Sequence, residues 1–448
     1  MPETNTESIT DSGPEAGPAS GPDSGQPYSP SYRLYVLGML TLVYVFNFLD
    51  RQLLVILQEP IKAELGLSDT QLGLLSGLAF AAVYVTAALP LAQLAERWSR
   101  RSMVALSLAT WSGMTAITGF VNSFTQLLFA RAAVGIGEAG ASPASHSIIS
   151  DIFPINRRAT ALAFYSIGIN LGVLLGFLLG GWINEFFGWR MAFIIVGIPG
   201  IALALAVRFT IKEPPKGLSL GIKTDAKPPG FFITAASLWR KPSFRHLALG
   251  TAMMSMVGYA IVNWLPSYMI RWHGMGTGEV GTWLALSAGA AGAVGTFGGG
   301  WLADRLAARD QRWYQWVSAG SAIIVLPMMC LVLLAGHPTM AMLLYIIPAC
   351  LQTACIGPSL AATHSLVDIR SKSVGSAILF FIVNLIGLGL GPLSVGLVSD
   401  YLEPTYGNES LRWALLSVVV LIGSLAIMHF LLAARTFRHD SGAMANQG

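Results

Sequence analysis

The chain has 448 residues, of which 54% are hydrophobic and only 11% are charged, whereas soluble domains carry about 25% charged residues. This composition indicates a membrane protein and argues against a soluble globular domain. The net charge of +4 does not indicate nucleic-acid binding, because the basic residues fall mainly in short segments between apolar stretches. The three cysteines lie within apolar stretches and predict neither a disulfide framework nor a metal site.

Residues 1–31 form a polar segment rich in Gly, Pro, Ser and Thr, with acidic residues but no Lys or Arg. A secretory signal would begin with basic residues followed by an apolar core. The segment therefore predicts a disordered, uncleaved cytoplasmic tail.

Twelve apolar spans follow, each near the roughly 20 residues that a helix needs to cross a bilayer. They cover approximately 34–57, 70–95, 102–121, 124–149, 158–184, 189–210, 244–270, 279–303, 313–335, 338–364, 373–399 and 410–434. A long polar interval, Lys212–Lys241, divides them into two groups of six. The sequence predicts an all-α membrane protein with twelve transmembrane helices in two pseudo-symmetric six-helix bundles, at 32–211 and 244–435. A cytoplasmic linker at 212–243 joins the bundles, and a cytoplasmic tail at 436–448 follows them.

The distribution of the 27 Lys and Arg residues predicts the orientation. If the N-terminus is cytoplasmic, the outer loops hold only Lys62, Arg190, Arg271 and Arg412, and three further arginines lie within spans. All the others fall in inner loops and tails. Because cytoplasmic loops are enriched in Lys and Arg, we expect both termini to be cytoplasmic in a multi-pass protein of a bacterial inner (plasma) membrane.

The two halves of the chain repeat one another. Asn47–Leu49 in the first span corresponds to Asn263–Leu265 in the seventh, and Leu94–Arg97 after the second span corresponds to Leu302–Arg305 after the eighth. Parallel six-span repeats of this kind build one large class of transporters, whose substrate site lies near the midplane between the halves.

Four charged residues lie inside two spans of the first half: Asp50 and Arg51 in the first span, and Arg131 and Glu138 in the fourth. A charge at that depth costs about 2.5–3.5 kcal/mol by the lower estimates. At about 1.5 Å per residue, the depths in two antiparallel helices let Arg51 approach Glu138 and Asp50 approach Arg131. All four charges would then be matched.

Two interpretations of these charges are open. They could be structural ion pairs that fix the first helix against the fourth. Alternatively, they form a proton-coupling site in which Asp50 or Glu138 takes up a proton and Arg51 is released to an anionic substrate, and this is the interpretation that we favour. In the second half, Pro266 and Ser267 stand at the positions of Asp50 and Arg51, so we expect coupling to be confined to the first half.

Two further sets of residues suggest roles inside the bundle. Aromatic and amide residues of several spans are candidates for lining the substrate cavity, namely Tyr84, Trp111, Asn263, Trp264, Tyr268 and Gln352. In the fifth span, glycines recur every four residues at positions 168, 172, 176 and 180. Such a stripe of small residues permits close packing of helices.

The segment Ala92–Arg101, after the second span, is similar to the acidic-Arg-x-Gly-Arg-Arg signature of the major facilitator superfamily. It departs from that signature with Ala92 and Ser99 at glycine positions and Glu96 in place of aspartate. The chain resembles this superfamily over residues 32–435. The resemblance implies a secondary transporter with a cytoplasmic gate, formed here by Glu96, Arg97, Arg100, Arg101, Asp304 and Arg305.

More narrowly, Asn47–Arg51 together with Arg131–Ala139 resembles the spinster subfamily. Its animal members are associated with export of sphingosine 1-phosphate and lysolipids. The resemblance implies a lipid-like or lysolipid-like substrate and favours export.

The sequence contains neither a Gly-x-x-x-x-Gly-Lys-Ser/Thr motif nor the His-Glu-x-x-His and Gly-x-Ser-x-Gly motifs of hydrolases. We therefore expect no enzyme activity, no cofactor and a proton gradient as the energy source. The prediction is a proton-coupled secondary transporter of an amphipathic lipid-like compound, a monomeric exporter that works by rocking of its two halves. Its partners would be that compound, protons and membrane lipids, with no nucleic acid. The alternatives are uptake of small organic or phosphorylated anions, a multidrug/proton antiporter, and a non-transporting membrane receptor or scaffold.

Overall fold

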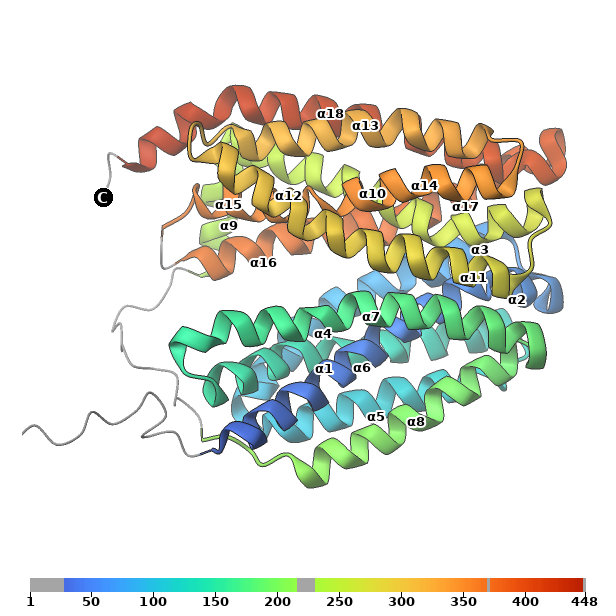
Figure 1. The fold of residues 1–448 in the computed structure, drawn as a ribbon, viewed down its shortest axis with the longest axis horizontal. Coiled ribbons are helices and arrows are strands. Elements are labelled where there is room, and N and C mark those ends of the chain that lie inside the picture. The colour runs from blue at the N-terminus through green and yellow to red at the C-terminus, as the bar shows by residue number, and fades with distance from the viewer. Residues whose placement is uncertain (1–27, 216–229, 369–370, 446–448) are drawn as a thin grey trace, which may run out of the picture.

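The structure is a computed structural model that describes residues 28–215, 230–368 and 371–445, without the side chains of Leu89, Ala92, Glu96 and residues 441–445. Figure 1 shows two bundles of long helices lying side by side, the first half in blue to green and the second in yellow-green to red. The first and last described helices begin and end, respectively, on the same side of the molecule (Figure 1). We call this side the termini end and the opposite side the far end.

Six membrane-length elements make up the first half. They are α1 (Pro30–Ile56), α3 with α4 (Asp69–Ser76 and Leu78–Arg97), α5 (Arg100–Thr118), α6 (Phe124–Ile152), α7 (Ile155–Phe187) and α8 (Trp189–Thr210), with the short α2 (Gln58–Leu65) after α1. Serine side chains cap the starts of several of them: Ser68 accepts a hydrogen bond from the amide of Gln71, and Ser99 from that of Ser102. Such caps satisfy amides that the first helical turn leaves without partners.

The second half repeats the same plan with more interruptions. Its elements are α10 (Pro242–His273), α11 (Thr277–Leu284) with η1 (Ala285–Ala291) and α12 (Gly292–Ala307), α13 (Trp313–Leu334), α14 (Pro338–Thr353) with α15 (Ile356–His364), α16 (Lys372–Val383) with η3 (Asn384–Leu390) and α17 (Gly391–Tyr406), and α18 (Ser410–Ala445) after η4 (Gly407–Glu409). The segments η1 and η3 are π-helical. A π-helical turn carries an extra residue and is frequent at functional sites.

Nine segments within the described residues are long and apolar enough to cross a membrane. One of them, Lys372–Asp440, contains both the α16–α17 element and α18. Two further helices of sufficient length, α5 and α6, are richer in serine, glycine and charged residues. With these, the structure has the twelve membrane-spanning elements that the sequence predicts.

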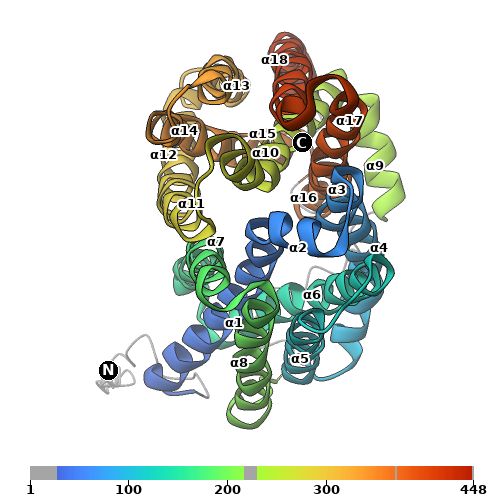
Figure 2. The same cartoon turned by 90° about the vertical axis from the view of Figure 1, so that its right-hand side faces the viewer.

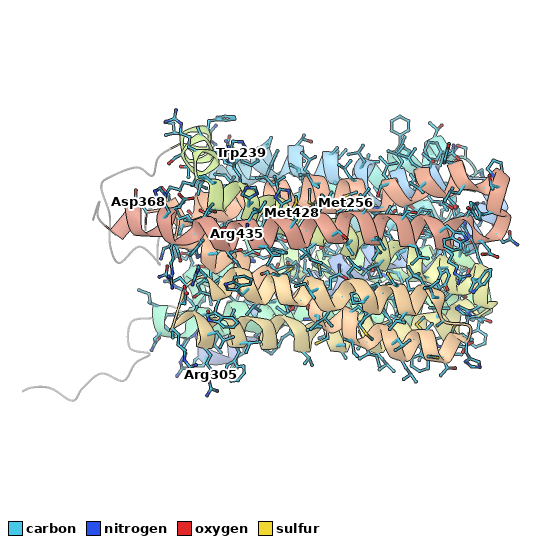
Figure 3. The ribbon with its side chains drawn as sticks, turned by 90° about the horizontal axis from the view of Figure 1, so that it is seen from above. Trp239, Met256, Arg305, Asp368, Met428 and Arg435 are labelled. Carbon is cyan, nitrogen blue, oxygen red and sulfur yellow. The ribbon has the colours of Figure 1, made fainter. Side chains whose placement is uncertain are left out.

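The structure differs from the prediction at the linker and at the C-terminal tail. The predicted linker 212–243 contains an additional helix, α9 (Phe231–Arg240), and residues 216–229 of it lie outside the described residues. Figure 3 shows α9, marked by Trp239, almost end-on while the spans run across the view, so its axis crosses theirs. The predicted tail 436–448 continues α18 as far as Ala445. Of the predicted tail 1–31, residues 1–27 lie outside the described residues.

The glycine stripe of α7 lies directly against α1. A methyl group placed on Gly168, Gly172 or Gly176 would come within 2.9, 2.5 and 2.7 Å, respectively, of a backbone oxygen of α1. Since a side-chain carbon essentially never approaches a backbone oxygen that closely, only glycine allows the two helices to approach this far. The predicted packing role of the stripe is thereby confirmed, because α7 packs closely along α1.

The two halves meet chiefly near the far end. Seen from that end in Figure 2, α3 lies beside α17 and α7 beside α11. Glycines again permit the contact, because a methyl group on Gly73 would lie 2.5 Å from the carbonyl oxygen of Pro392 and one on Gly281 would lie 2.4 Å from that of Phe177. The interface therefore holds the halves together on the side away from the termini.

We predict that Gly172→Ala lowers the apparent melting temperature of the detergent-solubilised protein by several degrees. The added methyl group would overlap the Val45 carbonyl oxygen, and overpacking of this kind costs about 1–3 kcal/mol. The matched control is Gly113→Ala in α5, where the methyl group meets nothing within 4 Å. Equal melting temperatures for the two variants would contradict the packing argument.

Candidate functional site

The four buried charges of the first half form two ion pairs between α1 and α6. Arg51 donates from Nε and Nη2 to Glu138 Oε2, each at 2.7 Å. Arg131 donates from Nη1 to Asp50 Oδ2 at 3.3 Å, and the Thr115 hydroxyl of α5 donates to the other oxygen of Asp50. The pairing expected from helix depth is therefore confirmed.

All four side chains are withdrawn from solvent. Glu138 is fully buried, Asp50 and Arg131 are 3% and 7% exposed, and the Arg51 side chain is 15% exposed. Within the described part of the chain, Glu138 Oε1 and Arg131 Nε are buried without a hydrogen-bond partner. Buried polar atoms are nearly always satisfied, so this site has unused hydrogen-bonding capacity.

Glycines of α6 explain why Glu138 can lie so close to its neighbours. A methyl group on Gly137 would lie 2.9 Å from the Trp111 amide nitrogen, and one on Gly140 would lie 2.6 Å from the Ser107 hydroxyl. The absence of side chains at these positions lets α6 press against α5. The carboxylate of Glu138, between the two glycines in sequence, is thereby enclosed in the bundle.

Aromatic rings surround the two guanidinium groups. The Cζ atom of Arg51 lies 5.0, 4.9 and 5.2 Å from the ring centres of Phe48, Phe80 and Tyr84, and that of Arg131 lies 4.8 Å from Phe80. These distances are typical of cation–π interactions. Tyr84 is one of the residues predicted to line the cavity. Phe48 was not predicted, although its position three residues before Arg51 on the same helix indicates that the two side chains are neighbours.

A cavity of about 50 Å³ lies beside Arg51, between the two halves. Its wall includes Arg51, Gln52 and Arg131 of the first half and Tyr259, Asn263 and Leu388 of the second. This volume suits a few water molecules and is far below the roughly 300–1,000 Å³ of a ligand pocket. The charge site thus faces the junction between the halves.

The predicted cavity residues divide into two groups. Asn263 lines the small cavity and Tyr84 lies beside Arg51, while Gln352 donates to the carbonyl oxygen of Met254 at 3.2 Å.

The other three are packed inside one half or the other. Trp111 is 1% exposed and contacts α6. Trp264 and Tyr268, equally buried, donate to the carbonyl oxygens of Pro392 and Leu333 at 2.8 and 2.9 Å. None of these three belongs to the residues lining the small cavity among those described.

Arg100 is the best-connected member of the predicted cytoplasmic gate. Its guanidinium contacts Asp151 and Ser147 of α6, Glu213 and the carbonyl oxygen of Pro214. Burial alone would raise the pKa of Glu213, but hydrogen bonds from Ser99 and from the amides and side chain around Arg100 hold that pKa below its ordinary value. Arg100 therefore ties α5, α6 and the start of the linker together.

Of the other gate candidates, Asp304 and Arg305 contact residues of their own half. Asp304 accepts a hydrogen bond from Tyr314 at 3.3 Å, and Arg305 lies 5.4 Å from the ring of Trp301, at the termini end (Figure 3). Arg97 is exposed, Arg101 donates to Ile211, and the Glu96 side chain is not among those described. Whether these residues close a gate in another conformation stays a prediction.

A charged network that sequence reasoning missed joins the halves at the far end. Arg271 of α10 donates to both oxygens of Asp69 at 2.7 and 2.6 Å and to Glu59 at 2.8 Å. Asp400 of α17 accepts from the amides of Asp69 and Thr70 at 2.9 and 2.8 Å. The available signal was the position of lone charges at the outer ends of spans, since Arg271 is one of only four basic residues expected there. Arg271 and its partners are more than 200 residues apart in the sequence, so the pairing could not be read from sequence spacing.

Comparison with known proteins gives three relevant similarities in sequence and one in structure. Residues 40–392 match the family model of the Major Facilitator Superfamily. An MFS-type efflux pump of Mycolicibacterium smegmatis is 35% identical over 408 residues, covering 90% of this chain and 93% of that protein. A D-galactonate transporter of Escherichia coli is 28% identical, covering 89% and 95%.

The fold is similar to a solved structure of a bacterial homologue of the human lysosomal transporter Spinster, in an inward-facing and unoccupied conformation. The TM-score is 0.84 at 31% identity, over 92% of this chain and 99% of that one.

We predict that Glu138→Gln and Arg51→Gln each destabilise the protein, while the double variant recovers much of the loss. Each single change leaves a buried charge without its partner, which costs about 3–5 kcal/mol, whereas replacing both members of a buried pair is often nearly neutral. The measurement is the apparent melting temperature, at neutral pH, of the parent, the two single variants and the double variant. Arg312→Gln, which removes a more exposed pair with Asp310, is the control with little expected effect. Strictly additive losses in the double variant would argue against the pairing.

We also predict that Arg271→Gln opens the far end. The change removes hydrogen bonds between charged groups that contribute about 1.5–3 kcal/mol each, so the population with separated halves should rise at least several-fold. Spin labels at the exposed positions Ala63 and Asn408, in a background free of native cysteines, report the distance across this end. Arg190→Gln is the control, because Arg190 pairs with Glu64 inside the first half. An unchanged distance distribution would show that the network does not hold this end closed.

Proposed function

Because the chain belongs to the major facilitator superfamily, whose members are secondary transporters, we propose that it is a proton-coupled exporter of an acidic, lipid-like amphiphile. The observation that carries this proposal is the pair of buried salt bridges, Arg51–Glu138 and Arg131–Asp50, beside the cavity at the junction of the halves. A protein that needed only to fix α1 against α6 could do so with apolar residues at lower cost.

The proposed coupling uses the difference between the two kinds of charged group. Arginine stays charged at any accessible pH, so only Asp50 and Glu138 can take up a proton. When Glu138 does so, Arg51 loses its counter-ion. Arg51 lines the cavity between the halves, where an acidic head group can take the place of the carboxylate. Proton uptake and substrate binding would then be linked through one guanidinium group, so that an exported anion would carry its proton outward with it.

Orientation follows from the charge distribution. With both termini cytoplasmic, as the excess of Lys and Arg on that side favours, the far end faces outward and is closed. The structure then corresponds to an inward-facing state, which is also the state of the similar solved structure. Transport would proceed by release of the far-end network and approach of the halves at the termini end.

An amphiphile suits the two sides of the cavity. Arg51 and Arg131 supply positive charge from the first half, whereas the second half contributes Tyr259, Val262, Asn263 and Leu388. Pro266 and Ser267 stand where the first half has Asp50 and Arg51, and Ser267 contacts Gln58 instead of bearing a charge. The similarity to an efflux pump supports the direction of export. The lipid-like substrate rests on the resemblance of Asn47–Arg51 and Arg131–Ala139 to the spinster subfamily.

Two other substrates have specific support. Similarity to a D-galactonate transporter over most of the chain favours uptake of a small organic anion, which Arg51 could also bind. Similarity to an efflux pump equally fits a multidrug/proton antiporter. The receptor or scaffold alternative is set aside, because family membership assigns the chain to transporters.

Probes in proteoliposomes separate these substrates. A pH-sensitive dye inside the vesicles reports proton movement when lysophosphatidic acid, glycerol 3-phosphate, galactonate or ethidium is added. We expect proton flux with lysophosphatidic acid and none with glycerol 3-phosphate, which has the same head group but no acyl chain. A response to galactonate alone, or to ethidium alone, would replace the proposal with the corresponding alternative.

We predict that Asp50→Asn reduces proton-driven flux of the active probe at least ten-fold while thermal stabilisation by that probe persists. The amide cannot exchange a proton, whereas the Arg51–Glu138 pair beside the cavity is left unchanged. Asp310→Asn is the matched control, because Asp310 is an acidic residue outside the spans. Full coupling in Asp50→Asn would remove Asp50 from the proton pathway.

A further inference from the structure

Phe80 is placed between both ion pairs of the site. Its side chain is 1% exposed, and its ring centre lies 4.9 Å from Cζ of Arg51 and 4.8 Å from Cζ of Arg131. Two guanidinium groups of like charge therefore share one ring. Among the described residues, Phe80 is a side chain that contacts the guanidinium groups of both pairs, and it therefore links them.

The backbone around Phe80 also packs against the second half. The helix is interrupted at Gly77, between α3 and α4, and a methyl group there would lie 2.7 Å from the carbonyl oxygen of Gly389. A methyl group on Gly389 would in turn meet the side chains of Leu78 and Ala81 at 3.4 and 3.6 Å. Residues 77–81 thus pack against the π-helical segment η3, so this stretch connects Phe80 to the second half.

From this arrangement we infer that Phe80 is a positioning residue for proton coupling, which deepens the proposed function and rests on it. Its ring holds Arg51 and Arg131 in place and stabilises each of them while its carboxylate partner is protonated. Because the same segment contacts η3, the charge state of the first half is linked to the position of the second half.

The direction of the effect follows from electrostatics. The negative face of an aromatic ring attracts a cation more strongly when no carboxylate neutralises that cation. The ring therefore favours the protonated site over the ion-paired site. Weakening the ring's negative face should make protonation harder and move the response to lower pH.

Other groups that could titrate near this ring come from several helices. They are Asp50 and Tyr44 on α1, Tyr84 on α4, Arg131 and Glu138 on α6, and Tyr259 on α10. The segment η3 contains no titratable side chain. Of these groups, only the two carboxylates change charge across the acidic range.

The test measures conformation against pH without any substrate. Spin labels at Ile155 and Leu302, both exposed at the termini end, are introduced after Cys330, Cys350 and Cys355 are replaced by Ala. Phe80 is then substituted by mono-, di- and trifluorinated phenylalanine, which weakens the negative face of the ring at nearly constant size. We expect the pH midpoint of the distance change to fall stepwise, by about one pH unit in total.

Variants with natural amino acids provide a second test of the role of Phe80. Phe80→Leu should shift the midpoint in the same direction, whereas Phe80→Tyr, which retains a ring, should restore it to within a few tenths of a unit. Phe430→Leu controls for the loss of a buried ring, because Phe430 is also fully buried and packs against Gly250 of α10.

Each outcome has a distinct meaning. A stepwise acid shift with rescue by tyrosine supports the role of Phe80. A pH-dependent parent whose midpoint is unchanged through the fluorine series overturns that role and leaves proton coupling intact. A parent without any pH-dependent distance change, with Asp50→Asn behaving identically, overturns the proposed coupling and this inference together.

Discussion

The structure depends on the mutual neutralisation of four charges buried between α1 and α6. Each charge alone would disfavour insertion of its helix into a bilayer. Together, Arg51 with Glu138 and Arg131 with Asp50 form a compact site whose formal charge is zero. Neighbouring residues support this pairing. The glycines of α6 let the helices approach closely, and the hydroxyl of Thr115 donates a hydrogen bond to Asp50.

A second group of charges performs a different task at the far end. Arg271, Asp69, Glu59 and Asp400 lie where water can reach part of the network, since the cavity beside them has a volume of about 400 Å³. Their bonds cross from one half to the other, whereas both ion pairs of the buried site remain within the first half. The chain continues from Arg51 through the end of α1 into α2, which carries Glu59. The buried ion pairs and the far-end network are thus connected through the backbone of residues 51–59.

Much of this arrangement could be predicted from the sequence, because it follows from regular helix geometry. Rise per residue sets the depth of Asp50 and Glu138, and hence their partners. The positions of Phe80 and of the far-end network could not be derived in this way, since they depend on how α4 and α17 are rotated about their axes. The break at Gly77 and the π-helical turn at η3 alter that rotation. Trp264 and Tyr268, expected in the cavity, lie on α10 and instead donate hydrogen bonds to carbonyl oxygens of the second half.

The zero formal charge of the paired site has an electrical consequence. Under the proposed cycle, one added proton gives the site a charge of +1, and movement of that charge through the membrane field is driven by about 2.3 kcal/mol per 100 mV. A monovalent anionic cargo bound beside Arg51 would bring the total back to zero. Transport of such a cargo together with its proton would be insensitive to voltage, whereas a protonated carrier that crossed without cargo would move a net charge and be accelerated or opposed by the membrane potential.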